Sequence, residues 1–141
     1  FVRALEALVA SSLDAFVDRL TAVDHPLARA RPARWRMHTW ATLLRTGGHQ
    51  APHLHPAGWA SGVYYLAVPG IEEAATDGWI EFGAPPDALA RDDGLPTRSF
   101  RPEAGRMLLF PSSSYHRTLP HRGEALRISI AFDVVPGQPG P

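Results

Sequence analysis

Apolar and polar positions along the chain change their period near residue 35. In residues 1–23 the apolar side chains recur at every third or fourth position, which is the period of an amphipathic α-helix. Pro26 ends this helix, because the residue before a proline disfavours the helical conformation. The sequence therefore predicts one N-terminal helix with a single buried face. That face is formed by Phe1, Leu5, Leu8, Val9, Leu13, Phe16, Val17 and Leu20.

Beyond residue 34, short apolar segments alternate with turn residues, a pattern typical of β-strands. A helix followed by about six to eight short strands predicts a mainly-β fold, a sandwich or barrel with a flanking N-terminal helix. We expect a helix and connection in residues 1–34, a β core in residues 35–136 and a flexible tail in residues 137–141. Residues 84–98 read as a polar loop. The expected strands are WRMHTWATLL (35–44), HLHP (53–56), ASGVYYLAV (60–68), GWIEFG (78–83), RMLLFP (106–111) and LRISIAFDVV (126–135).

Composition narrows the class of partner and of metal ligand. The 14 basic and 14 acidic residues give a net charge of zero, and no basic tract predicts a nucleic-acid partner. No apolar run is long enough to cross a membrane, so we expect a cytoplasmic protein. Cysteine is absent, so a metal would need His, Asp or Glu ligands, which suit iron, manganese, nickel or zinc. The chain starts without Met inside a helical pattern, and we expect an excised domain of a longer protein.

Three of the seven histidines lie within residues 49–55, just before a predicted strand. Side chains at positions i and i+2 of a strand point to the same face, so His53 and His55 are expected to aim together. Two imidazoles on one face can bind a metal if a third ligand arrives from elsewhere; the alternative is two surface histidines in a proline-flanked loop. His49 lies in a glycine-rich turn, and we assign it a supporting or substrate-contacting role rather than direct ligation.

A third ligand is suggested by His116, which follows the strongly apolar strand that ends at Pro111. A ligand placed just after a core strand is held rigidly. His121 stands in a turn between Pro120 and Arg122, and we expect it to be an exposed loop residue rather than a ligand.

An arginine interrupts the apolar strand near the C-terminus. Arg127 shares one strand face with Ser129 and Ala131, and a buried guanidinium is costly unless it is paired. It could form a structural salt bridge, with partners among Asp133, Asp77 and Glu81. Alternatively, its planar guanidinium binds the carboxylate of a ligand, and the hydroxyl of Ser129 donates a further hydrogen bond to that carboxylate.

These residues, in this order, resemble the iron(II)- and 2-oxoglutarate-dependent oxygenases: His53-Leu54-His55, then His116, then Arg127-Ile128-Ser129. Residues 38–136 are also similar to the 2OG-Fe(II) oxygenase domain found at the carboxyl end of some bacterial tetratricopeptide-repeat proteins. The resemblance implies a double-stranded β-helix, also called a jelly-roll or cupin-like core, and an upstream repeat domain in a longer chain.

The resemblance also implies a set of roles. His53, His55 and His116 would hold iron(II), and Arg127 with Ser129 would bind the distal carboxylate of 2-oxoglutarate. Tyr64 or Tyr65 would be a further hydrogen-bond partner of the cosubstrate. The two point to opposite faces, and Tyr65 is in phase with His53 and His55 if the strand is unbroken. The implied reaction hydroxylates a C–H bond of a peptide, amino acid or small molecule, with release of succinate and carbon dioxide.

The sequence departs from the usual family pattern at His55, which stands where the metal-binding carboxylate is expected. Three interpretations follow: His55 is itself a ligand, it stands aside for water, or a carboxylate comes from elsewhere, with Glu81 as the best candidate. We favour three histidines. Such a site lacks one negative charge, so we expect weaker retention of divalent metal.

Two other functions fit parts of the pattern. A cupin-type dioxygenase or isomerase that does not use 2-oxoglutarate would explain three histidines but not the pair Arg127 and Ser129. A non-catalytic metal- or ligand-binding module on the same scaffold is the second alternative. Trp59 and Trp79 are expected to be core residues rather than pocket walls.

Overall fold

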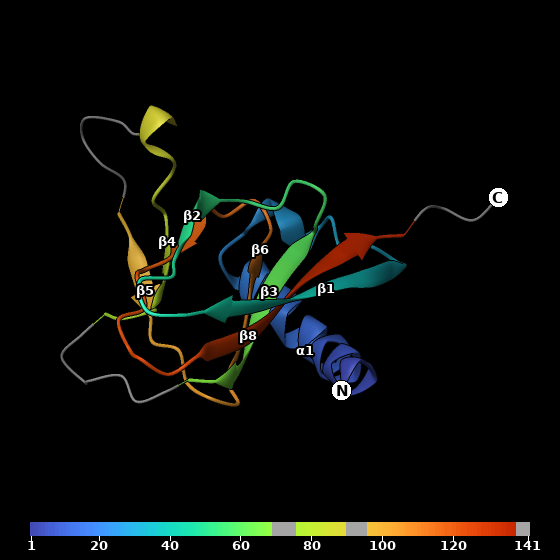
Figure 1. Cartoon of the computed structure of the whole chain (residues 1–141). Helices are drawn as coiled ribbons and strands as arrows, with labels where there is room; N and C mark the ends of the chain where they lie inside the picture. The colour runs from blue at the N-terminus through green and yellow to red at the C-terminus, as the bar shows by residue number, and fades with distance from the viewer. Residues whose placement is uncertain (69–75, 90–95, 138–141) are drawn as a thin grey trace.

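The computed structural model describes residues 1–68, 76–89 and 96–137 (Figure 1). Helix α1 (Val2–Ala22) and the short 3-10 helix η1 (Pro26–Ala28) precede the strands. A second 3-10 helix, η2, covers Asp87–Leu89. The strands are β1 (Trp35–Leu44), β2 (Gln50–His53), β3 (Ala60–Ala67), β4 (Ile80–Phe82), β5 (Arg98–Phe100), β6 (Met107–Pro111), β7 (His116–Thr118) and β8 (Arg127–Pro136).

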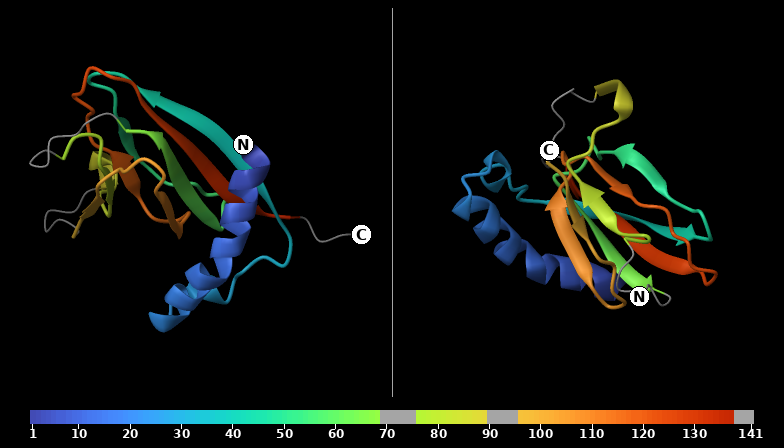
Figure 2. Two further views of the ribbon diagram at one scale, coloured as in Figure 1. Left: turned by 90° about the horizontal axis from the view of Figure 1, so that it is seen from below. Right: turned by 90° about the vertical axis from the view of Figure 1, so that its left-hand side faces the viewer.

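The strands form two four-stranded antiparallel sheets. One sheet has the order β1-β8-β3-β6 and the other has the order β2-β7-β4-β5. Apart from the consecutive strands β4 and β5, the chain alternates between the two sheets, as expected for a double-stranded β-helix. Helix α1 lies outside the first sheet (Figure 2). The predicted mainly-β fold with an N-terminal helix is confirmed.

Helix α1 covers the outer face of the first sheet through most of the apolar stripe that the sequence predicts. Phe1 and Leu8, which were expected on that face, are instead 64% and 43% exposed. The buried side chains of the helix pack against residues of β3 and β8 and against Trp59, whose ring makes an edge contact with Phe16 at 5.7 Å between centroids. Trp59 also donates a hydrogen bond from Nε1 to the Leu27 carbonyl, at 3.0 Å. Each fully buried aliphatic or Phe side chain contributes about 1.5–3 kcal/mol, so this contact is a main part of the core. The helix contributes Leu5, Val9, Leu13, Phe16 and Leu20.

Strand β8 occupies a central position between β1 and β3 and carries different residues on its two faces. Phe132 and Val134 are fully buried toward the helix. Gly62 of β3 lets the Phe132 ring approach closely, because a Cβ at position 62 would lie 2.3 Å from Phe132 Cζ. The opposite face of β8 carries Arg127, Ser129 and Ala131 into a cavity between the two sheets. The strand therefore joins the apolar core to the polar interior.

The strand boundaries differ from the prediction where strands are short. The strand expected at residues 53–56 ends at His53 and begins earlier, so His55 lies beyond it. Strands β5 and β7 were not anticipated; β5 begins at the end of the expected loop 84–98. Residues 90–95 of that loop and residues 138–141 of the expected tail lie outside the described residues. Within the described ranges, no helix combines the length and apolarity that crossing a membrane requires.

Candidate functional site

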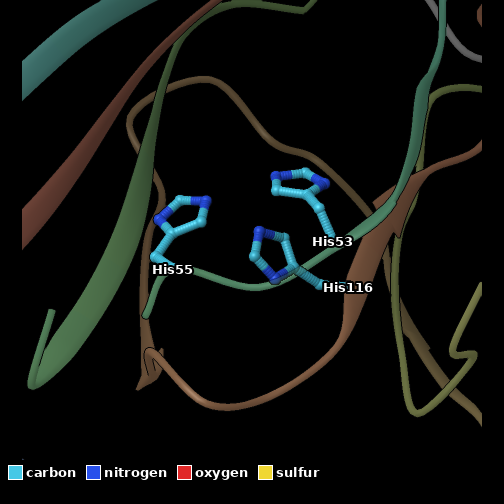
Figure 3. Close-up of side chains that lie close together, drawn as sticks. All are labelled: His53, His55 and His116. Atoms are coloured by element: carbon cyan, nitrogen blue, oxygen red, sulfur yellow. The ribbon is translucent and has the colours of Figure 1, made fainter. Parts of the chain in front are cut away.

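Three imidazole rings meet at one end of the space between the sheets (Figure 3). His53 is the last residue of β2, His116 is the first residue of β7, and the two are paired directly across the strands. Ring centroids are 4.3 Å apart for His53 and His116, 5.2 Å for His53 and His55, and 5.0 Å for His55 and His116. Although His55 follows β2, its backbone N–H donates to the Ser112 carbonyl at 2.9 Å, which fixes the loop. The three histidines that the sequence singles out thus form one cluster.

Hydrogen bonds determine which nitrogen of each ring is free. Nδ1 of His53 lies 2.7 Å from the Ala51 carbonyl oxygen, and Nδ1 of His116 lies 3.0 Å from that of Ser114. Nδ1 of His55 lies 2.5 Å from Oδ1 of Asp133. Carbonyl and carboxylate oxygens can only accept, so each Nδ1 carries the proton and each Nε2 keeps its lone pair. This is the arrangement found in metal-ligating histidines, whose second nitrogen donates to a carbonyl or carboxylate.

Burial keeps His116 in the neutral form that a metal requires. Only 6% of the residue is exposed, and the Phe110 ring lies 4.8 Å from its own ring. Burial lowers the pKa of His116 to about 4, against the opposing effect of its hydrogen bond to Ser114. At neutral pH this ring is an uncharged nitrogen donor.

The cluster fits a divalent transition metal in its donor type and nearly in its dimensions. One ligand nitrogen from each ring lies within 4.8 Å of the others. Two bonds of about 2.1 Å can span at most about 4.2 Å, so binding would draw the rings slightly together. Imidazole suits iron, copper, nickel and zinc. No carboxylate belongs to the group in the described part of the chain.

Glu81, the expected alternative carboxylate ligand, is engaged elsewhere. Its Oε1 accepts hydrogen bonds from Nε and Nη2 of Arg117, at 2.7 and 2.6 Å. His49 is exposed and does not belong to the cluster.

Arg127 lies in the same cavity as the three histidines, and it is 2% exposed. Its Nε and Nη1 are buried and have no hydrogen-bond partner. The three expected acidic partners are committed elsewhere: Asp133 to His55, Glu81 to Arg117, and Asp77 to Arg122 at 3.7 Å. Among the described residues Arg127 therefore has no carboxylate partner, which argues against its interpretation as half of a structural salt bridge.

Tyr65 and Ser129 line the cavity beside Arg127. Ser129 is paired with Tyr65 on β3 and with Thr42 on β1, so three polar side chains form one row across the sheet. The guanidinium carbon of Arg127 lies 5.1 Å from the centroid of the Tyr65 ring, whose hydroxyl is buried without a partner. Burial raises the pKa of Tyr65 to about 12, although the charge of Arg127 opposes this shift. Burial likewise lowers the pKa of Arg127.

Unpaired buried donors are rare in folded proteins, and each one calls for an explanation. At this end of the cavity two guanidinium nitrogens of Arg127 and the hydroxyl of Tyr65 lack a hydrogen-bond partner. An anionic ligand with a planar oxygen pair, such as a carboxylate, would satisfy them. The residues therefore fit a metal at one end of the cavity and a carboxylate at the other.

Two features of the site were not found by sequence reasoning. Asp133 contacts His55, and its position could have been inferred by extending the alternation of Arg127, Ser129 and Ala131 by one more step along β8. Trp40, rather than Trp59 or Trp79, stands at the cluster, with its ring 5.4 Å from that of His55.

The expectation that His121 is exposed was wrong, because this loop residue is 1% exposed. Its Nε2 donates to the Ala125 carbonyl at 2.9 Å, and its backbone bonds both Gly47 and Gly48. No local pattern in a Pro- and Gly-rich turn predicts such long-range packing.

A larger cavity of about 580 Å³ lies elsewhere, between α1 and strands β4 to β6. Its walls include Phe16, Phe82, Phe100 and Phe110, but none of the clustered histidines. The size of a cavity therefore does not identify the candidate site here. The buried polar atoms without a partner, on Arg127 and Tyr65, are the better guide.

Comparison with known proteins agrees with this geometry. Residues 38–133 match the family described as "Putative 2OG-Fe(II) oxygenase". A prolyl-4-hydroxylase from Pseudomonas putida has a similar fold, with a TM-score of 0.59 and 19% identity over 90% of this chain and 80% of that chain. An oxidoreductase of the 2OG-Fe(II) oxygenase family from Burkholderia pseudomallei gives a TM-score of 0.52 and 16% identity over 73% of this chain and 47% of that chain. No curated protein matches the sequence. The family match spans well over half of the chain, which therefore belongs to the 2OG-Fe(II) oxygenase family of 2-oxoglutarate-dependent oxidoreductases.

Proposed function

We propose that this oxygenase holds iron(II) through His53, His55 and His116 and binds 2-oxoglutarate through Arg127, Ser129 and Tyr65. The reaction is the hydroxylation of a C–H bond in a peptide, amino acid or small molecule, with release of succinate and carbon dioxide. When bound, the iron and the oxo acid supply the oxidising chemistry of the family.

The observation that carries the proposal is the unpartnered guanidinium of Arg127 in the cavity of the three histidines. A buried cation without a counter-ion lowers stability, so its retention points to a ligand that supplies the charge. The distal carboxylate of 2-oxoglutarate is such a group, and its oxo-acid end would then face the histidines. The family membership agrees with this direction.

The protein's own residues have separable tasks under this proposal. Arg127 and Ser129 orient the cosubstrate, because a planar fork and a hydroxyl give a directional grip on a carboxylate. Tyr65 keeps its proton at any ordinary pH and so serves as a donor rather than a second anion. The aromatic wall of Phe82 and Phe110 keeps water from one side of His116.

An anaerobic titration tests the assignment. Purified protein is stripped of metal, loaded with iron(II), and then titrated with 2-oxoglutarate while the visible spectrum is recorded. A charge-transfer band that grows with 2-oxoglutarate supports the proposal. Metal uptake without the band supports a cupin-type enzyme that does not use this cosubstrate, and no metal uptake supports a non-catalytic module; either result contradicts the proposal.

The substrate class is tested separately by following succinate formation in air. One protein of similar fold is a prolyl-4-hydroxylase, so proline-containing peptides are assayed beside free amino acids. Substrate-dependent stimulation of succinate release, together with a mass increase of one oxygen atom in the substrate, identifies a hydroxylation. Succinate release that no added compound stimulates contradicts the choice of substrates.

A further inference from the structure

We infer that Asp133 supplies, through His55, the negative charge that the three-histidine cluster lacks. The inference rests on the proposed metal site and extends it to a residue that does not itself contact the metal. Asp133 is a positioning residue: it orients the His55 ring and makes its Nε2 a stronger donor. The negative charge that a carboxylate ligand usually supplies would then lie one hydrogen bond away from the metal, on Asp133 behind His55.

The contact between Asp133 and His55 is short and sheltered. Oδ1 of Asp133 lies 2.5 Å from Nδ1 of His55, and both side chains are 14% exposed. A carboxylate that accepts from the far nitrogen of a ligating histidine fixes the ring and raises its basicity. Burial by itself would raise the pKa of Asp133, but the hydrogen bonds from His55 and Ser61 hold it below its usual value.

Two buried serines hold the carboxylate in place. Ser61 donates to Oδ1 of Asp133 at 2.6 Å, and its Oγ lies 2.7 Å from Oγ of Ser112. Ser61 has a single hydroxyl proton, so Ser112 must be the donor in the second bond. Ser61 and Ser112 are 0% and 1% exposed. Gly58 leaves room for these hydrogen-bonded serines, because a Cβ at position 58 would lie 2.4 Å from Ser112 Oγ.

The hydrogen-bonded group of Asp133, Ser61 and Ser112 supports only one of the three histidines. His53 and His116 donate to backbone carbonyls, which carry no net charge, whereas His55 donates to a carboxylate. His55 is also the residue that stands where the family usually has its carboxylate ligand. Glu81, the other acidic side chain considered for the site, is neutralised by Arg117. The negative charge of Asp133 therefore lies next to His55, the histidine that stands in place of the usual carboxylate ligand.

The position of Asp133 also ties the two halves of the site together. Asp133 lies six residues from Arg127 on the same face of β8, so one strand carries both the carboxylate anchor and the histidine orienter. Across the sheet it is paired with Ser61 on β3. Asp133 and Ser61 thus lie on central strands of the sheet, which hold them rigidly, whereas His55 and Ser112 follow the ends of their strands.

Cobalt(II) binding to the metal-free protein tests this role without an assay of activity. The variants are Asp133→Asn and Ser61→Ala, with Asp14→Asn as a matched surface control. Removal of such a supporting group weakens metal binding by about 10–100-fold, so Asp133→Asn is expected to raise the dissociation constant by that factor and to change the cobalt visible spectrum. Ser61→Ala should have a smaller effect in the same direction, and Asp14→Asn should have none.

The outcomes separate this inference from the proposed function. Failure of the wild-type protein to bind cobalt would contradict the metal site itself. Wild-type binding with an Asp133→Asn affinity within about threefold and an unchanged spectrum would overturn only the role of Asp133. Should Asp133→Asn fail to fold, the zinc-loaded wild type decides by NMR. The Nδ1 proton of His55 must then appear far downfield and protected from exchange, and its absence overturns the inference.

Discussion

The buried side chain of Arg127 lowers the stability of the metal-free protein. Its guanidinium is buried, and two of its nitrogens lack any partner. Each buried unsatisfied donor costs about 1–3 kcal/mol, and more when it is charged. A residue that only stabilised the fold would not carry this cost, whereas one that waits for an anionic ligand must carry it until the ligand binds.

Arg127→Met should separate the two roles. An apolar side chain of similar length removes the uncompensated charge, so the metal-free variant should be as stable as the wild type or more stable in urea unfolding. Loss of a charge-assisted hydrogen bond costs about 1.5–3 kcal/mol, so 2-oxoglutarate should bind about 10–100-fold more weakly by calorimetry. Metal affinity should be unchanged. Arg122→Ala, at an exposed position, is the control; unaltered 2-oxoglutarate binding in Arg127→Met would refute the assignment.

Residue spacing was sufficient to predict that the three histidines come together, but not the contacts that support them. His53, His55 and His116 could be predicted because imidazoles at short spacing near strand ends are an uncommon combination. Asp133 and His121 could not be assigned correctly, because their partners lie far away in the sequence. Asp133 bonds a residue 78 positions away, and His121 bonds the turn at Gly47 and Gly48. Such contacts exist only once the sheets have formed.

The turn around Gly78, just before strand β4, packs against the Arg127 end of the cavity. Gly78 has φ of +63°, and a Cβ there would meet Arg127 Cδ at 3.3 Å and Nε at 3.4 Å. Its N–H donates to the Pro120 carbonyl at 3.1 Å, which holds the turn against the loop that follows β7. The turn thus forms a wall that limits where the guanidinium can lie.

Gly78→Ala and Gly105→Ala form a matched pair. Both glycines have positive φ, so alanine at either position should destabilise the protein by about 1 kcal/mol in urea unfolding. Gly105 has no atom within 4 Å of its added Cβ, whereas the Cβ at position 78 presses on Arg127. Only Gly78→Ala is therefore expected to weaken 2-oxoglutarate binding, by several-fold in calorimetry. Equal affinities of the two variants would show that the turn does not position the arginine.

Helix α1 gives the clearest test of how the elements pack. Leu13 is 2% exposed in the core between α1 and the first sheet, whereas Leu8 is 43% exposed on the same helix. Leu13→Ala should lower the free energy of unfolding by about 2–5 kcal/mol, and Leu8→Ala should change it by about 0.5 kcal/mol or less. Chemical denaturation of both variants measures this difference. Similar losses in the two variants would mean that the helix does not pack on the sheet through this face.

Long elements could be predicted from the sequence with little error, and short ones could not. The helix and strand β1 agree with the expected bounds to within one residue, because each has several regularly spaced apolar positions. Strands β5 and β7 have three residues each, too few to show any period. They are specified by partners, since β4 pairs with both of them. The second sheet therefore depends on tertiary pairing more than the first.

For the whole molecule, the metal-free state should lose stability as the pH falls. His116 has a folded-state pKa of about 4, lowered by burial from 6.5. Between these two values the unfolded chain binds more protons than the folded one, so the free energy of unfolding decreases as the pH is lowered through this window. The full effect is on the order of 3 kcal/mol. The pKa of Asp133 lies below its usual value of 3.8, so its contribution is lost only at lower pH.

Urea unfolding of metal-free protein at pH 7.5, 6.5, 5.5 and 4.5 measures this slope, with His116→Gln as the variant that should flatten it. A saturating divalent metal stabilises the folded state in proportion to the logarithm of its concentration over its dissociation constant, and protons compete for the same nitrogens. The stabilisation by metal should therefore be greatest at pH 7.5 and should disappear toward pH 4.5. If the metal-free wild type is equally stable at pH 7.5 and 4.5, His116 is not held neutral by burial, and the cluster is more open to water than the packing of Phe82 and Phe110 implies.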